Sequence, residues 1–176
     1  MNSNKFLKSL GLTGEVNHKQ LDNRLLRSLN EDEKSDLRNA WVKLHNYDTT
    51  SDLYSIPKTL KQASLLFSHD YFRIKTSMEW ISDLVECLKP NAIVDMGCGY
   101  GVLIRFLQLK FPDISFMGID KKENLISIGS NLTGINLISG DYSTYDQEKS
   151  YDMIICDFGF DMEDLLLPKN AHTSTE

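Results

Sequence analysis

The chain has 176 residues, of which 41% are hydrophobic and 10% aromatic. This composition suits one domain with a hydrophobic core. The sequence contains no apolar run of the ~20 residues that a membrane span needs. Residues 1–75 have a net charge of +3 and residues 76–176 one of −9, so the second half is a poor match for the phosphate backbone of a nucleic acid. The three cysteines lack metal-ligand spacing, which predicts reduced thiols, no metal site and a cytoplasmic protein without membrane contact.

Residues 1–75 are predicted to form a helical segment. In "LNEDEKSDLRNAWVKLHNY", Asn30 and Glu33 have the spacing of a capping box, and apolar residues then follow at steps of four and three. Pro57 suits the first turn of a second helix, "KTLKQASLLF". A third helix, "HDYFRIKTSMEWISDLVECL", keeps the helical period up to Pro90 and crosses into the second half.

The pattern changes after Pro90. "AIVDM", "ISFMGID", "INLISGD" and "YDMIICD" read as short buried strands, and "VLIRFLQLKF" and "KKENLISIGSNL" as helices between the first three. Strands that alternate with helices predict a parallel sheet with right-handed crossovers. Residues 76–176 are therefore expected to form an α/β domain with a Rossmann-like doubly wound sheet, which binds ligands at the carboxyl ends of its strands.

The turn after the first strand, "DMGCGYG", runs from Asp95 to Gly101. Three glycines in five residues predict a tight turn, because glycine takes positive φ and lets a backbone or a ligand come close. The free N–H groups and the positive end of the next helix face the same crevice. The position three after Gly99 is Val102, so the dinucleotide-binding fingerprint fails, and the phosphate-binding loop motif is absent.

This D-x-G-x-G-x-G stretch resembles the cofactor motif of the class I S-adenosylmethionine-dependent methyltransferases. In that family an acid that ends the second strand binds the ribose hydroxyls, and Asp120 closes "FMGID" 21 residues beyond Gly99. The family also places polar residues after strands three and four, near the adenine and the methyl group, where this chain has Asp141, Tyr142 and Asp157. The resemblance implies S-adenosyl-L-methionine as the cofactor and methyl transfer as the reaction.

The cofactor site that the resemblance implies consists of Asp95, Gly97, Cys98, Gly99, Gly101, Asp120, Lys121, Asp141, Tyr142 and Asp157. Two alternatives stay open, since Asp95 either touches the ligand or only orients the turn, and Asp120 is either a cofactor contact or a helix N-cap. Cys98 is expected to offer its backbone and not a nucleophile. Tyr71 and Phe72 resemble aromatics that close over the cofactor in some members, or they pack in the core. No catalytic base is identified.

The resemblance covers only about residues 75–160, through the fourth strand, whereas the family's sheet has seven strands. The four strands present here are expected in the order 3-2-1-4. We therefore expect a fragment, a truncated gene product or a natural short form. The exposed edge of the fourth strand then invites self-association. Two functions remain: a methyltransferase acting on an unidentified small molecule, protein or RNA, or a degenerate, catalytically inactive cofactor-binding module that serves as a partner or regulatory subunit.

Overall fold

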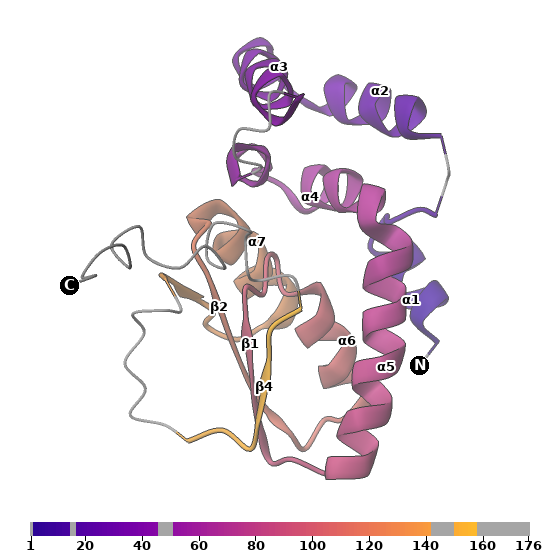
Figure 1. Cartoon of the computed structure of the whole chain (residues 1–176), viewed down its shortest axis with the longest axis vertical. Coiled ribbons are helices and arrows are strands. Elements are labelled where there is room, and N and C mark those ends of the chain that lie inside the picture. Colours follow the sequence, from indigo (N-terminus) through magenta and orange to yellow (C-terminus); the bar gives the residue numbers. More distant parts are fainter. Residues whose placement is uncertain (1, 15–16, 46–50, 142–149, 158–176) are drawn as a thin grey trace, which may run out of the picture.

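The computed structural model describes residues 2–14, 17–45, 51–141 and 150–157 (Figure 1). The first half contains α1 (Ser3–Ser9), α2 (His18–Ser28), α3 (Glu31–His45), η1 (Ser51–Ser55), α4 (Leu60–Phe67), η2 (Ser68–Asp70) and α5 (Tyr71–Leu88), where η marks a 3₁₀ helix. The second half contains β1 (Ala92–Met96), α6 (Val102–Lys110), β2 (Ser115–Asp120), α7 (Glu123–Thr133), β3 (Ile138–Ser139) and β4 (Met153–Ile155).

The described strands form one parallel sheet in the order β3-β2-β1-β4. β1 is the central strand, with Asp95 opposite Gly118 of β2 and Ile155 of β4. Because the strands are parallel, the carboxyl ends of β1, β2 and β4 meet at one edge of the sheet. The predicted strand order and the predicted Rossmann-like fold class are confirmed.

A single buried cluster joins the sheet to the helices on one of its sides. It contains Ile93 and Ile155 of the strands, Met78 of α5, Leu107 of α6 and, from the N-terminus, Phe6 of α1. Each such side chain contributes ~1.5–3 kcal/mol when it is fully buried. Figure 1 shows α5 and α6 side by side along the sheet, with α1 on the outer side of α5.

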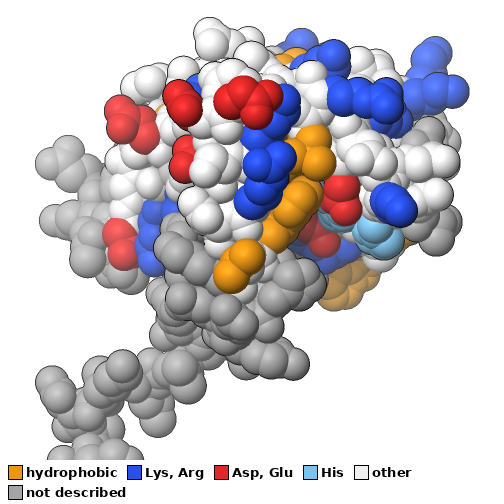
Figure 2. Space-filling model, turned by 90° about the horizontal axis from the view of Figure 1, so that it is seen from above, with side chains coloured by type: hydrophobic (Ala, Val, Ile, Leu, Met, Phe, Trp, Pro, Cys, Tyr) orange, Lys and Arg blue, Asp and Glu red, His pale blue; other side chains and the backbone are white. Residues whose placement is uncertain are grey.

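The helices α2, α3, η1 and α4, hereafter the helical layer, lie above the carboxyl ends of the strands (Figure 1). They have a buried cluster of their own, which includes Leu25, Leu37, Ile56 and Leu65. Figure 2 looks down on this layer and shows basic side chains mostly at one side and acidic ones mostly at the other, with a strip of hydrophobic side chains between. This face therefore has no uniform charge that would favour a polyanion.

The predicted division into residues 1–75 and 76–176 falls inside α5, which runs without a break from Tyr71 to Leu88. The division itself stays a prediction. No helix in the described part of the chain combines the length and the apolar character that crossing a membrane requires.

Two helix starts can be compared with their predictions. The capping box of α3 is confirmed, since the Asn30 N–H donates to Glu33 Oε2 at 3.0 Å and the Glu33 N–H donates to Asn30 Oδ1 at 2.9 Å. The second predicted helix begins at Leu60 and not at Pro57. The reason is a stronger cap: Thr59 and Gln62 form a reciprocal capping box that satisfies two backbone N–H groups.

The apolar stripe of α5 is buried in its centre and exposed at one margin. Ile74, Met78 and Val85 are at most 6% exposed, whereas Leu84 is 37% and Leu88 62% exposed. A step of three residues falls ~60° short of a full turn in a helix of 3.6 residues per turn. Leu84 lies three residues after Ile81 and Leu88 three after Val85, so both side chains are rotated away from the core.

Within the described residues β4 pairs with β1 alone, and Ile154 of β4 is 60% exposed. Self-association through this edge stays a prediction, since unpaired strand edges template pairing with another chain. Sedimentation velocity over a wide range of concentrations should show species heavier than the 20.1 kDa chain. A monomer at every concentration would contradict it.

Gly129 of α7 lies against the glycine turn, residues 97–101. A Cβ on Gly129 would stand 2.6 Å from Leu137 Cδ1 and 2.9 Å from the carbonyl carbon of Tyr100. Because backbone cannot yield as a flexible side chain can, we expect Gly129→Ala to lower the free energy of unfolding by about 1–3 kcal/mol, despite the better helix propensity of alanine. Urea unfolding measures this. The control is Gly140→Ala, whose Cβ would meet nothing within 4 Å, and an equal loss in both variants would contradict the steric argument.

Candidate functional site

The glycine turn has the backbone that its sequence predicts. Gly97, Gly99 and Gly101 have φ values of 82°, 54° and 71°, in the region that disfavours residues with a side chain. The N–H groups of Gly97 and Cys98 both donate to the carbonyl oxygen of Ile119, at 2.8 and 3.0 Å. The turn is therefore held against the end of β2.

Asp120, the last residue of β2, completes this attachment. Its Oδ2 accepts from the Gly99 N–H and its Oδ1 from the Lys122 N–H, both at 2.8 Å. Burial raises the pKa of the Asp120 carboxyl, while the N–H groups of Lys122 and Gly99 lower it. The residue at the N-cap of α7 is Lys122, so Asp120 is not that cap. A carboxylate has about four accepting positions, and Asp120 can therefore accept further donors.

Acidic residues lie at the carboxyl ends of three neighbouring strands, β2, β1 and β4, as the sequence predicts. Asp95 of β1 is only 3% exposed. Burial raises the pKa of its carboxyl to about 8, with smaller effects from Asp157 after β4 and from Asp120. The described residues thus bring together three carboxyl groups, and a positively charged ligand would favour their charged forms.

The remaining predicted residues lie beside this group. Asp141 follows β3, and its Oδ2 lies 3.5 Å from Lys121 Nζ. Tyr142 is outside the described residues. Burial raises the pKa of the Cys98 thiol well above its ordinary value, with Asp95 and Asp120 as further causes. Because the thiolate is the nucleophilic form, Cys98 is suited to the backbone role that the sequence predicts.

An aromatic wall covers the glycine turn from the side of the helical layer, and the sequence did not reveal it. The Phe67 ring stands 3.3 Å from the place that a Cβ of Gly99 would take. It also packs edge-on against Tyr100, with 4.9 Å between ring centroids, and against Tyr54 at 5.4 Å. Tyr54 and Phe67, hereafter the aromatic wall, precede Gly99 in the sequence by 45 and 32 positions. The only sequence signal was the glycine itself, which indicates a close neighbour without identifying it.

Tyr71 and Phe72, the aromatics considered from the sequence, lie elsewhere. They pack on each other at 5.5 Å and against Gly14, and the Tyr71 hydroxyl donates to Asn4 Oδ1 at 2.9 Å. Phe72 is 63% exposed. These contacts assign Tyr71 and Phe72 to the packing of the N-terminal segment.

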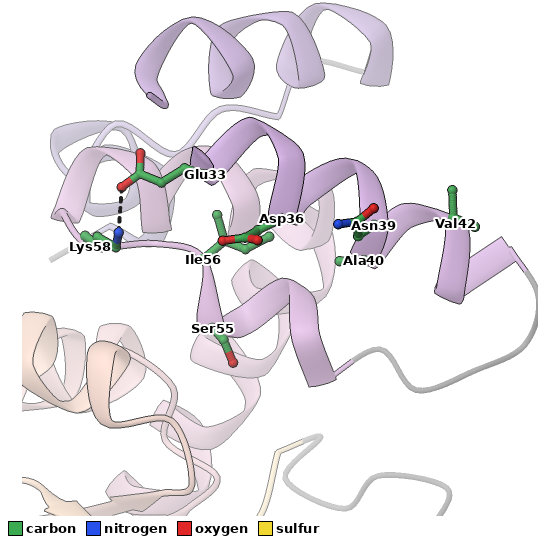
Figure 3. Close-up of a pocket in the computed structure, with 8 residues that line it drawn as sticks. All are labelled: Glu33, Asp36, Asn39, Ala40, Val42, Ser55, Ile56 and Lys58. Carbon is green, nitrogen blue, oxygen red and sulfur yellow. Dashed lines mark ion pairs between the residues drawn. The ribbon is translucent and has the colours of Figure 1, made fainter. Parts of the chain in front are cut away.

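A hollow of about 610 Å³ lies within the helical layer, between α3 and the segment that follows η1 (Figure 3). Its lining residues are Glu33, Asp36, Asn39, Ala40, Val42, Ser55, Ile56 and Lys58. The Lys58 Nζ and Glu33 Oε1 atoms form an ion pair of 3.1 Å at its wall. None of the described residues that were predicted for the cofactor site lines it, so it is a separate feature.

Comparison with known proteins agrees with this geometry. Residues 93–169 match the family model described as a methyltransferase domain. The chain is 32% identical over 72 residues to a malonyl-[acyl-carrier protein] O-methyltransferase of Priestia megaterium (strain DSM 319 / IMG 1521), a match that covers 39% of this chain and 26% of that protein. It is 21% identical over 125 residues to a Papaver bracteatum protein named "Probable (S)-tetrahydroprotoberberine N-methyltransferase 2", covering 60% and 35%. The matches thus span about a quarter to a third of the length of these curated relatives.

Two solved structures are also similar. The plantazolicin methyltransferase BpumL, in complex with a monoazolic desmethylPZN analog and SAH, has a TM-score of 0.46 at 22% identity, covering 85% of this chain and 55% of that one. The SAM-bound amino pentose methyltransferase CalS10 of Micromonospora echinaspora has a TM-score of 0.42 at 19% identity, covering 50% and 40%. Residues 93–169 are thus similar to a methyltransferase domain, and the strand order and the glycine motif agree with the class I S-adenosylmethionine-dependent methyltransferases.

The raised pKa of Asp95 predicts a pH dependence of stability. Its value of about 8 in the folded chain lies above the ordinary 3.8, so the folded state holds a proton that the unfolded chain has released. The stabilisation is complete at low pH and is lost as the pH rises toward 8. Between about pH 5 and about pH 8 we expect the free energy of unfolding to decrease less in Asp95→Asn than in the wild type. Urea unfolding measures this.

The control for this measurement is Asp152→Asn. Backbone N–H groups of Asn91 and Ala92 lower the pKa of Asp152, so that carboxyl titrates below the range of the experiment. An Asp95→Asn slope equal to that of the wild type would contradict the expectation.

Proposed function

We propose that this chain binds S-adenosyl-L-methionine and transfers its methyl group to an acceptor. The observation that carries the proposal is the bond of 2.8 Å between the Gly99 N–H and the Asp120 carboxylate. It places the glycine turn directly beside an acid at the carboxyl end of the sheet. A carboxylate there can accept both vicinal ribose hydroxyls in charge-assisted hydrogen bonds, while the glycines admit the rest of the ligand.

The residues present fit that cofactor. The proposed contacts are Asp95, Gly97, Cys98, Gly99, Gly101, Asp120, Lys121, Asp141, Asp157 and Tyr142, of which Tyr142 lies outside the described residues. In this proposal Asp120 accepts the ribose hydroxyls, Asp141 approaches the adenine amine and Asp157 lies nearest the methyl group. Asp95 holds a proton below about pH 8, and a cationic ligand would favour its charged form. When bound, the cofactor supplies the methyl group on a sulfonium, so the chain's own residues need mainly to bind and align it.

The acceptor that we favour is a small molecule or a peptide. Two observations support this choice: one relative is named for tetrahydroprotoberberine and another for a malonyl group on an acyl-carrier protein, and the second half of the chain carries a net charge of −9, which disfavours RNA. We also propose a cytoplasmic location, supported by the lack of a disulfide bond at Cys87, Cys98 and Cys156.

Removal of the Asp120 carboxylate tests the cofactor assignment. Asp120→Ala should weaken binding of S-adenosylhomocysteine by roughly 1.5–3 kcal/mol, the effect of losing hydrogen bonds to a charged group. Isothermal titration calorimetry measures it. A dinucleotide that binds in place of S-adenosylhomocysteine, or an unchanged affinity in the variant, would contradict the assignment.

Asp152→Ala is the matched control for this variant. Asp152 also accepts two backbone N–H groups, from Asn91 at 2.6 Å and from Ala92 at 3.1 Å. These bonds lie at the amino end of β1, so their loss should affect stability and leave the affinity for S-adenosylhomocysteine unchanged.

A further inference from the structure

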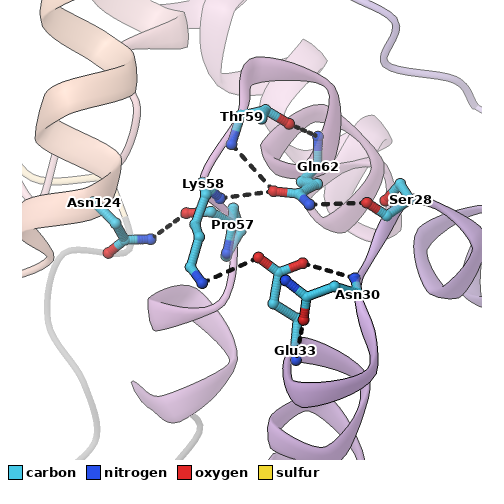
Figure 4. A network of polar contacts seen from close by, with 8 residues as sticks. All are labelled: Ser28, Asn30, Glu33, Pro57, Lys58, Thr59, Gln62 and Asn124. Carbon is cyan, nitrogen blue, oxygen red and sulfur yellow. Dashed lines mark hydrogen bonds and ion pairs between the residues drawn. The ribbon is translucent and has the colours of Figure 1, made fainter.

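Asn124, in the first turn of α7, bridges the two halves of the chain. Its side-chain Nδ2 donates to the carbonyl oxygen of Tyr54 at 2.9 Å and to that of Pro57 at 2.7 Å. Figure 4 shows the bond to Pro57. One amide has two N–H donors, and Asn124 uses both on backbone that lies 67 and 70 positions earlier in the chain.

The segment that Asn124 holds is joined to the rest of the helical layer by a network of polar contacts (Figure 4). Gln62 Oε1 accepts from the N–H groups of Lys58 and Thr59, at 2.8 and 3.1 Å. Gln62 Nε2 donates to the Ser28 carbonyl at 3.0 Å, and Lys58 pairs with Glu33. The network thus connects α2, α3 and α4, and Asn124 is its contact with α7.

The same segment carries one half of the aromatic wall. Tyr54 is held through its carbonyl oxygen, and its ring packs on Phe67, which in turn packs against Gly99. Asn124 is also only four residues from Asp120. The position of the wall over the turn therefore depends on a clamp that starts next to the acid of the same site.

We infer that Asn124 is a positioning residue of the cofactor site: by holding residues 54–57 against α7, it sets the aromatic wall over the glycine turn. The inference rests on the proposed function for the identity of the ligand. The helical layer keeps its own buried cluster, which includes Ile56, and Ala63 of α4 stays in the main core, so loss of the clamp shifts residues 54–57 relative to α7 without unfolding the layer. Ligand affinity therefore changes more than stability.

The sharpest variant is Asn124→Asp, which keeps the shape of the side chain. It replaces the two donors with an oxygen that faces the carbonyl oxygens of Tyr54 and Pro57, so attraction becomes repulsion. The matched control is Asn131→Asp, seven positions further along α7, where Nδ2 donates to the Ser127 carbonyl of its own helix at 3.0 Å. Asn124→Ala, which removes the donors without adding charge, is the second variant if Asn124→Asp fails to fold.

Calorimetry with S-adenosylhomocysteine and hydrogen exchange without ligand test the inference on the full chain. Asn124→Asp should weaken binding by about tenfold or more, and Asn131→Asp by less than about twofold, in line with the loss of one or two hydrogen bonds. Amides of residues 53–58 should exchange faster in Asn124→Asp, while those of β1 stay unchanged. Far-UV circular dichroism confirms that each variant is folded.

The outcomes separate this inference from the proposed function. If the wild type does not bind S-adenosylhomocysteine, the proposed function fails, and exchange at residues 53–58 still decides whether Asn124 clamps the layer. If the wild type binds and both Asn124 variants bind equally well, the positioning role is overturned. Exchange at residues 53–58 that matches the wild type would overturn the clamp itself.

Discussion

The attachment of the glycine turn to the end of β2 is the constraint on which the rest of the site depends. The Ile119 carbonyl accepts from Gly97 and Cys98, and the Asp120 carboxylate accepts from Gly99. These bonds require positive φ at the glycines, which only a chain without Cβ atoms adopts at low cost. They also require β1 and β2 to be adjacent, which the parallel register provides.

Close packing beneath the turn has the same origin. Gly129 lets α7 approach the Tyr100 backbone, and Gly118 leaves room for Ile104 and Cys98 above β2. A methyl group at either position would overlap its neighbours, so the two glycines fix how near α6 and α7 come to the sheet. The glycine turn therefore rests on closely packed helices before any ligand binds.

The acidic residues at this edge of the sheet destabilise the folded chain when no ligand is bound. Burial of Asp95 beside Asp157 and Asp120 shifts its pKa far from the ordinary value, and such clusters recur at functional sites because a ligand of opposite charge relieves them. The aromatic wall packs on the same glycine turn, through the contacts of Phe67 with Gly99 and Tyr100. An acidic edge and an aromatic wall around one backbone turn suit a ligand that is cationic and partly apolar.

The two halves of the chain are joined in two different ways. α1 shares the main core with α5 and the sheet through Phe6 and Leu7, so this part cannot move without exposing apolar surface. The helical layer has a buried cluster of its own, contributes Ala63 of α4 to the main core, and meets α7 through the two hydrogen bonds of Asn124. Hydrogen bonds contribute ~1 kcal/mol each, so the position of residues 54–57 is sensitive to a single side chain.

The sequence by itself determined the sheet, the turn and the acids that end its strands. "AIVDM" coincides with β1, the glycines predicted the turn, and the alternation of strands and helices predicted a parallel sheet, for which the family resemblance implied the order 3-2-1-4. These features depend on local period, on backbone preference and on the handedness of crossovers, all of which a linear chain displays. Asp120 could be placed for the same reason, since it directly follows a strand.

Only the tertiary structure decided what covers the turn. Phe67, and not Tyr71 or Phe72, packs on Gly99, and Asn124 reaches back to Tyr54. The pKa of Asp95 depends in the same way on neighbours from β2 and β4. Each of these contacts joins residues more than 20 positions apart, and their side chains meet only after the helical layer has packed above the strands, which no local pattern encodes.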